Sequence, residues 1–113
     1  MVKSEFDLYQ ELQEKTVDLD KEVSNLKTNG IKRAEAEKDY KILLRKKCLE
    51  LRAEDMAIGM IDKTCYGIPE VADARFNRDV ADALYLANQE AINSIKLQLR
   101  LIESQIEREW NQK

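Results

Sequence analysis

The sequence predicts an all-α protein, built as an elongated antiparallel three-helix bundle or coiled coil. With three Gly and one Pro in 113 residues, the chain has few places to turn. Charged residues make up 36% and aromatic residues 6% of the chain, which is typical of long amphipathic helices and not of a sheet protein. Apolar residues recur at alternating spacings of three and four, which is the period of a helix. We therefore expect a single helical domain over residues 1–113.

The first helix is expected over residues 4–28. Ser4 can cap its N-terminus, with Asp7 three residues further on in a capping-box-like position. Asn29-Gly30 is a strong stop signal, because Gly readily takes the left-handed conformation that follows many helices. The heptad spacing predicts a packing seam made of Tyr9, Leu12, Thr16, Leu19, Val23 and Leu26.

The second helix is expected over residues 31–66, either continuous or broken near residues 55–57. Its main apolar stripe comprises Tyr40, Leu43, Leu44, Cys48, Leu51, Ile58, Ile61 and Cys65. A second stripe on the opposite side comprises Ile42, Leu49, Ala53, Met56 and Met60. A surface helix normally has one apolar face, so two faces indicate a helix that is sandwiched or that meets another chain. Gly67 suits the C-cap.

The third helix is expected over residues 70–111, with Pro69 in its first turn. Its apolar face comprises Ala74, Ala81, Tyr85, Ile92, Ile95, Leu99, Ile102, Ile106 and Trp110. Arg78 and Asp82 fall on the opposite, polar face. The first half has a broader apolar arc, and its alanines would let another helix approach closely.

Three antiparallel helices of about 25, 35 and 42 residues differ in length, so part of the two longer helices has no third helix packed against it. The excess falls at residues 56–79, an apolar tip formed by the second and third helices. Either a second chain covers this tip, or the segment 57–66 folds back over its own core. The candidate partner or oligomer interface comprises Ile42, Leu49, Met56, Met60, Ile61, Phe76, Val80, Ala83 and Ala87.

No residue pattern predicts catalysis, a metal site or a cofactor. The chain has no His, which is the commonest general base and metal ligand. Cys48 and Cys65 are predicted to be structural thiols. They would lie about 25 Å apart on a continuous helix and could approach only if it breaks. No apolar run reaches the length of a membrane span, and the N-terminus lacks the apolar core of a signal peptide. We expect a soluble cytoplasmic protein.

A locally basic segment supports an alternative function. Residues 31–55 hold eight basic and six acidic side chains, although the whole chain has a net charge of −3. Cations on one helix face can contact phosphates, in a manner that weakens steeply with salt. The interleaved acids favour a solvated face instead. The leading hypothesis is a non-enzymatic, self-associating adaptor or inhibitor that binds another protein. The alternative is a nucleic-acid-binding accessory factor, in which the phosphates would be contacted by Lys41, Arg45, Lys46 and Arg52.

Two stretches, residues 50–54 (ELRAE) and 75–85 (RFNRDVADALY), resemble a group of small helical proteins encoded by phages and prophages of Gram-positive bacteria. The similarity continues through residues 90–93, 95–100 and 107–110. It implies expression in the cytoplasm of the host cell, beside replication or recombination genes, and it carries no site residues. Members of the group often have a Gly-Met-Pro-like break where this chain has Asp55-Met56-Ala57, which favours a separate short helix over residues 57–66. This chain lacks the Gly and the Pro of that break.

Overall fold

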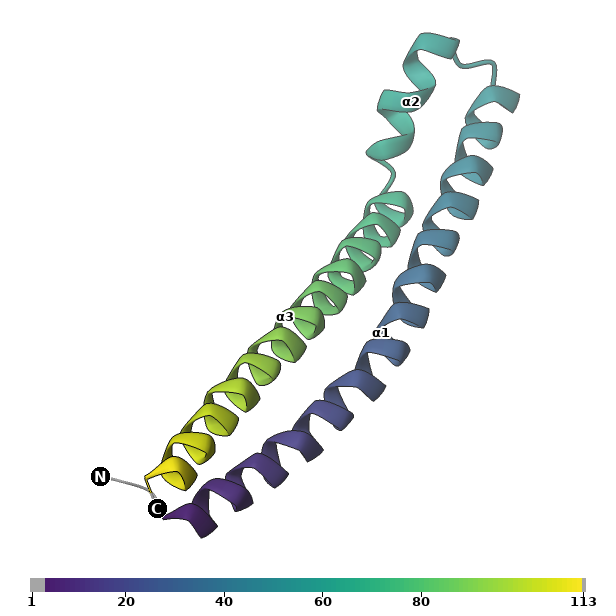
Figure 1. Ribbon diagram of the computed structural model, residues 1–113. Coiled ribbons are helices and arrows are strands. Elements are labelled where there is room, and N and C mark those ends of the chain that lie inside the picture. The colour runs from purple at the N-terminus through teal and green to yellow at the C-terminus, as the bar shows by residue number, and fades with distance from the viewer. Residues whose placement is uncertain (1–3, 113) are drawn as a thin grey trace. The chain divides into compact units, whose positions relative to one another are not determined.

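The computed structural model describes residues 4–112 and contains three α-helices (Figure 1). They are α1 (Glu5–Ala53), α2 (Ile58–Tyr66) and α3 (Pro69–Asn111). The predicted all-α fold class is therefore confirmed. The chain divides into two compact units, and the two long helices contribute to both. Unit 1 combines residues up to Thr28 with residues from Leu86 onward, and unit 2 comprises Asn29–Tyr85.

The N-terminal cap of α1 is confirmed. The backbone N–H of Asp7 donates a hydrogen bond to Ser4 Oγ at 3.2 Å, which satisfies one of the free donors of the first turn. Leu8, one residue further on, is fully buried in unit 1. The capped turn therefore directly precedes the first buried side chain of α1.

The predicted helix end at Asn29-Gly30 is wrong, because α1 continues through both residues. No glycine among residues 4–112 has a positive φ. Gly in a helix interior costs about 1 kcal/mol relative to Ala, and packing on both sides outweighs this cost. A Cβ at position 30 would lie 3.5 Å from the ring of Tyr85, at ordinary contact distance, so the ring lies beside Gly30 and leaves room for a methyl group. The two predicted helices 4–28 and 31–66 are thus joined into one helix as far as Ala53.

The predicted break near residues 55–57 is confirmed, and it ends α1 without Gly or Pro. Asp55 takes a left-handed conformation with φ 61°. The N–H of Met56 donates to the carbonyl of Leu51 at 3.3 Å, and the N–H of Asp55 donates to the carbonyl of Arg52 at 3.1 Å. This pair of hydrogen bonds is a Schellman motif, which satisfies the last carbonyls of a helix. Asp tolerates the left-handed conformation better than most residues.

Helix α2 folds back over the core of unit 2, which is the second of the two arrangements considered for the tip. It buries Ile61 and Cys65 and ends at the predicted C-cap, Gly67. Ile58, however, was assigned to the main stripe of the second helix and is 78% exposed. The break resets the helical phase, so the stripe of α1 does not continue into the first turn of α2. The core cluster consists of Tyr40, Cys65 and Val71, with Leu43, Leu44, Cys48, Leu51, Ile68 and Ala74 packed against it.

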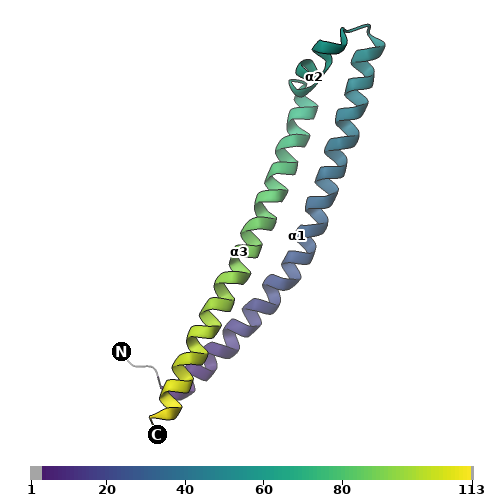
Figure 2. The ribbon, with the colours of Figure 1, turned by 45° about the horizontal axis from the view of Figure 1, so that its top comes forward.

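In unit 1, the N-terminal part of α1 lies antiparallel beside the C-terminal part of α3 (Figures 1 and 2). Half of the predicted α1 seam is wrong: Tyr9, Thr16 and Val23 are exposed. The inward positions are instead Leu8, Leu12, Lys15, Leu19, Glu22 and Leu26. The long stems of Lys15 and Glu22 can line an apolar seam while their charged ends reach solvent or a polar partner.

The predicted apolar face of α3 is largely confirmed. Ile92 and Ile102 are buried, and the other members of the face are half-buried. Trp110 is the exception, with 64% of its surface exposed. Asn88 occupies an inward position of the same heptad and is 6% exposed. Its Nδ2 donates hydrogen bonds to the carbonyl oxygen of Glu22 at 3.1 Å and to Glu22 Oε2 at 2.9 Å. Such a buried polar residue favours one register of two packed helices.

Candidate interaction surface

The inner side of unit 2 is built around two reciprocal Arg–Tyr contacts between α1 and α3. The Cζ atom of Arg33 lies 4.7 Å from the ring centroid of Tyr85. The Cζ atom of Arg78 lies 4.4 Å from the ring centroid of Tyr40. In each helix the Arg and the Tyr are seven residues apart, so antiparallel packing brings both pairs together. Both distances are within the range of favourable cation–π interactions.

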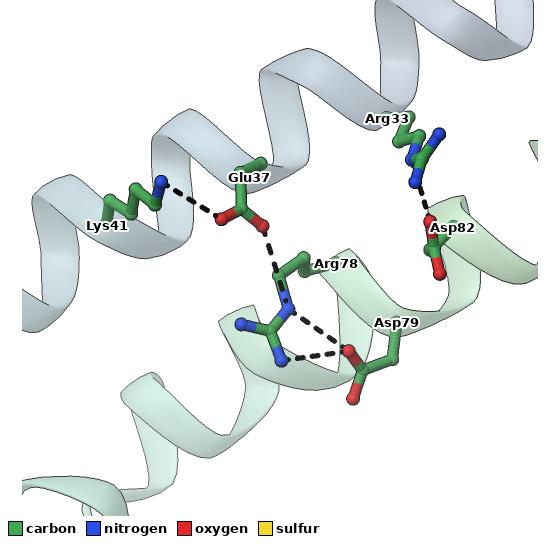
Figure 3. Close-up of polar contacts among 6 residues, drawn as sticks. All are labelled: Arg33, Glu37, Lys41, Arg78, Asp79 and Asp82. Carbon is green, nitrogen blue, oxygen red and sulfur yellow. Dashed lines mark hydrogen bonds and ion pairs between the residues drawn. The ribbon is translucent and has the colours of Figure 1, made fainter.

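Carboxylates surround the same two arginines (Figure 3). Arg33 Nε lies 2.7 Å from Asp82 Oδ1, and Arg78 Nη2 lies 3.0 Å from Asp79 Oδ1. Arg78 Nε is also 3.8 Å from Glu37 Oε2. The hydrogen bond to Asp79 is the main reason why the pKa of Arg78 is raised. The predicted position of Arg78 and Asp82 on the outer, polar face is wrong, because both are half-buried and turned toward α1.

These charged groups line a shallow groove of about 680 Å³, together with Gly30, Ala34 and Tyr85. Each arginine in the groove is already engaged with a carboxylate and with an aromatic ring. An anionic ligand would have to displace these contacts before it could bind. The contacts of Arg33 and Arg78 thus hold α1 and α3 together within unit 2, and a ligand in this groove would compete with them.

Two further contacts fix the end of unit 2 that contains α2. Lys47 Nζ lies 3.3 Å from Glu50 Oε2 and 3.3 Å from Glu70 Oε2, so it joins α1 to the first turn of α3. The hydrogen bond to Glu70, followed by the one to Glu50, raises the pKa of Lys47.

Cys48 and Cys65 are free thiols whose Sγ atoms lie 3.3 Å apart. This proximity follows from the break after α1, since the two residues would be far apart on a continuous helix. Burial is the largest cause that raises the pKa of Cys65 to about 11, followed by its hydrogen bond with Cys48. At neutral pH Cys65 is therefore a protonated core thiol and not an activated nucleophile.

An apolar stripe runs along the side of α1 that faces away from the core of unit 2. We define the α1 stripe as Ile42, Leu49 and Ala53, flanked by Lys38, Arg45, Lys46 and Arg52. Ile42 is 62% exposed and Leu49 53% exposed. Between them lies an open groove of about 550 Å³, lined by Ile42, Arg45, Lys46, Leu49, Glu50 and Ala53. The α1 stripe is thus apolar along its centre and mainly cationic along its edges.

A second apolar stripe lies on the corresponding outer side of α3. We define the α3 stripe as Phe76, Val80 and Ala83, flanked by Asp73 and Asp79. Phe76 is 67% exposed and Val80 41% exposed. The nearby arginines, Arg75 and Arg78, are half-buried and reach toward the aromatic rings of Tyr66 and Tyr40. Asp79 is paired with Arg78 and lines the α1–α3 groove, so the acidic character of the α3 stripe comes mainly from the exposed Asp73.

The remaining residues of the predicted interface occupy different environments. Met56 is half-buried in the α1–α2 connection, and Met60 is 54% exposed on α2. Ile61 is 8% exposed, because the chain's own core covers it. Ala87 is exposed but belongs to unit 1. Leu84 is 55% exposed in unit 2 but was not among the predicted interface residues. Its position in the broad apolar arc of the third helix could have indicated it.

The four cations of the nucleic-acid alternative do not all lie together. Arg45, Lys46 and Arg52 are exposed at the edges of the α1 stripe, and no ion pair within residues 4–112 joins them to a carboxylate. Lys41 is exposed on another side of α1 and pairs with Glu37 at 3.3 Å. Three of the four cations thus share the surface of the apolar α1 stripe.

No family model, no curated protein and no solved structure matches this chain. Within residues 4–112, no helix has the length and apolar content that crossing a membrane requires. In the same part of the chain, no three His, Cys, Asp or Glu side chains are grouped so that they could hold a metal ion.

Proposed function

We propose that this chain is a non-enzymatic helical interaction protein, which self-associates and acts as an adaptor or inhibitor of another protein. The observation that carries the proposal is the pair of outward apolar stripes on unit 2. The core of this unit is complete without them, since Tyr40, Cys65 and Val71 are buried among their neighbours. Exposed apolar surface that is bordered by charged side chains is characteristic of protein–protein contact sites.

We further propose that the protein works in the cytoplasm of a bacterial host and is of phage type. The similarity of residues 50–54 and 75–85 to small helical phage and prophage proteins supports this origin. Two free thiols also suit a reducing compartment, where cysteines rarely form disulfides.

Light scattering from micromolar to millimolar concentration tests the self-association. We expect a mass above that of the monomer, rising with concentration. Phe76→Asp should lower this mass without loss of the helical circular-dichroism signal, because Phe76 is exposed and its core-facing neighbours are untouched. Val17→Asp is the matched control, since Val17 is 54% exposed on unit 1 and outside both stripes. A wild-type protein that remains monomeric over the whole range would refute the self-association.

A nucleic-acid-binding accessory factor is the second candidate, favoured by the shared exposure of Arg45, Lys46 and Arg52. Phosphate contacts by these cations would make binding fall steeply as salt rises. Fluorescence anisotropy with single-stranded and double-stranded DNA, titrated with salt, separates the candidates. Arg45→Glu with Lys46→Glu should abolish any binding that this face provides. An absence of binding by the wild-type protein at low salt eliminates this candidate.

A further inference from the structure

We infer that the α1 stripe of one copy binds the α3 stripe of a second copy, so that self-association is heterologous. The inference rests on the proposed self-association and adds to it the identity of the two surfaces that meet. Both stripes belong to unit 2 and differ in direction, charge and shape.

The two stripes face away from each other. At 100° per residue, Ile42 lies about 200° around α1 from the buried Tyr40, and Phe76 lies about 140° around α3 from the buried Val71. The exposures agree, since Ile42 and Phe76 are 62% and 67% exposed while Tyr40 and Val71 are 5% and 0% exposed. One chain therefore cannot cover its own stripes, because each lies behind its helix, on the side opposite the α1–α3 contact.

The charges favour unlike stripes over like stripes. Two α1 stripes placed together would oppose Arg45, Lys46 and their neighbouring cations with an identical set. Two α3 stripes would bring Asp73 against the same acid of the other copy, while Asp79 is already paired with Arg78. An α1 stripe against an α3 stripe instead brings the cations of the α1 stripe toward Asp73. Electrostatic complementarity of this kind selects partners, because like charges that face each other weaken association.

The apolar side chains of the two stripes can also pack together. The surface between Ile42 and Leu49 is an open, mainly apolar hollow on one face of α1. Phe76 is the largest side chain of the α3 stripe, and it projects with most of its surface exposed. Phe76, Val80 and Ala83 follow the spacing of four and three that packs against a neighbouring helix. Packing of the Phe76 ring against this hollow of a second copy would bury both apolar surfaces, with the charged residues at the rim.

This arrangement predicts a particular form of assembly. Each copy uses two different surfaces, so every association leaves one α1 stripe and one α3 stripe uncovered at the ends. Such contacts produce rings or open chains and not a closed two-fold dimer. The average mass of an open chain therefore keeps rising with concentration beyond the mass of a dimer.

Two variants, each blocked on one stripe, test the inference. Leu49→Glu places a carboxylate where the acids of the α3 stripe would dock, and Phe76→Lys places a cation opposite the cations of the α1 stripe. Each variant alone should self-associate roughly 100-fold or more weakly than the wild-type protein. An equimolar mixture should associate again, because Leu49→Glu retains an intact α3 stripe and Phe76→Lys retains an intact α1 stripe. Sedimentation velocity measures all three samples, and circular dichroism verifies that each variant is folded.

The outcomes distinguish the inference from the proposed function. Association of the wild-type protein that persists in either single variant, or a mixture that stays monomeric, refutes the pairing of the two stripes and leaves self-association intact. A wild-type protein that never associates refutes both. If either variant unfolds, Ile42→Glu and Val80→Lys block the same two stripes at other exposed positions and replace the pair in the same experiment.

Discussion

Replacement of Gly30 by Ala tests the continuity of α1 directly. In the structure Gly30 lies within a helix of 49 residues and has no positive φ. The sequence alone predicts the opposite, a helix end at which Gly takes the left-handed conformation. The two arrangements give Gly30→Ala opposite signs of effect on stability.

The magnitude follows from two terms. Ala is favoured over Gly in a helix interior by about 0.8–1.0 kcal/mol. The added Cβ would lie 3.5 Å from Cε2 and 3.9 Å from Cδ2 of Tyr85, which is ordinary van der Waals contact without a clash. The free energy of unfolding should therefore rise by about 1 kcal/mol. For a domain of this size, that corresponds to an increase of roughly 3–6 °C in Tm.

Urea unfolding followed by circular dichroism measures the change, with both proteins at the same low concentration because self-association raises apparent stability. Gly59→Ala is the control: Gly59 lies in the first turn of α2 and has nothing within 4 Å of its added Cβ, so it reports an added Cβ that has neither packing nor a helix-interior position. If Gly30→Ala lowers the free energy of unfolding by 1 kcal/mol or more, Gly30 must adopt a conformation that Ala cannot reach. The continuous α1 would then be refuted.

Three other predictions concern single contacts. Asn88→Ala removes two hydrogen bonds from a side chain that is 6% exposed; it should lower the free energy of unfolding in urea by about 2 kcal/mol. The exposed control Asn93→Ala should change it by less than about 0.5 kcal/mol, and an equally small effect at Asn88 would contradict the buried hydrogen bonds. The pKa of the Cys65 thiol is raised from 9.0 to about 11. The unfolded thiol therefore deprotonates at a lower pH than the folded one. The contribution of Cys65 to stability is thus complete below pH 9 and is lost as the pH rises toward 11. A pH series of urea unfolding should show that Cys65→Ala removes this decline, and an unchanged slope would argue against the protonated core thiol. Arg78→Lys keeps the charge but loses the planar group over Tyr40, and it should cost about 1 kcal/mol; a double-mutant cycle with Tyr40→Leu that gives no coupling energy would rule out the ring contact.

The features that the sequence determined by itself are local or periodic. The small number of Gly and Pro residues and the spacing of apolar positions were sufficient for the all-α class and for most of the buried face of α3, including Ile92 and Ile102. The cap at Ser4 depends on residues within one turn, which is why it was predictable. The outward positions of Ile42, Leu49, Phe76 and Val80 also follow from helical periodicity, because a residue half a turn from the core must face outward.

Tertiary packing decided what local signals left open. Gly30 carries a strong stop signal, but the contact of this segment with Tyr85 on a distant part of the chain keeps it helical. The seam of α1 could pass through Tyr9 or through Leu8, and the hydrogen bonds of Asn88 to Glu22 identify the side that faces α3. Arg78 is turned inward because the ring of Tyr40 and the carboxylate of Glu37 are within its reach. Contacts between residues far apart in the chain outweigh local preferences of about 1 kcal/mol, and helical periodicity alone cannot specify which distant residues those are.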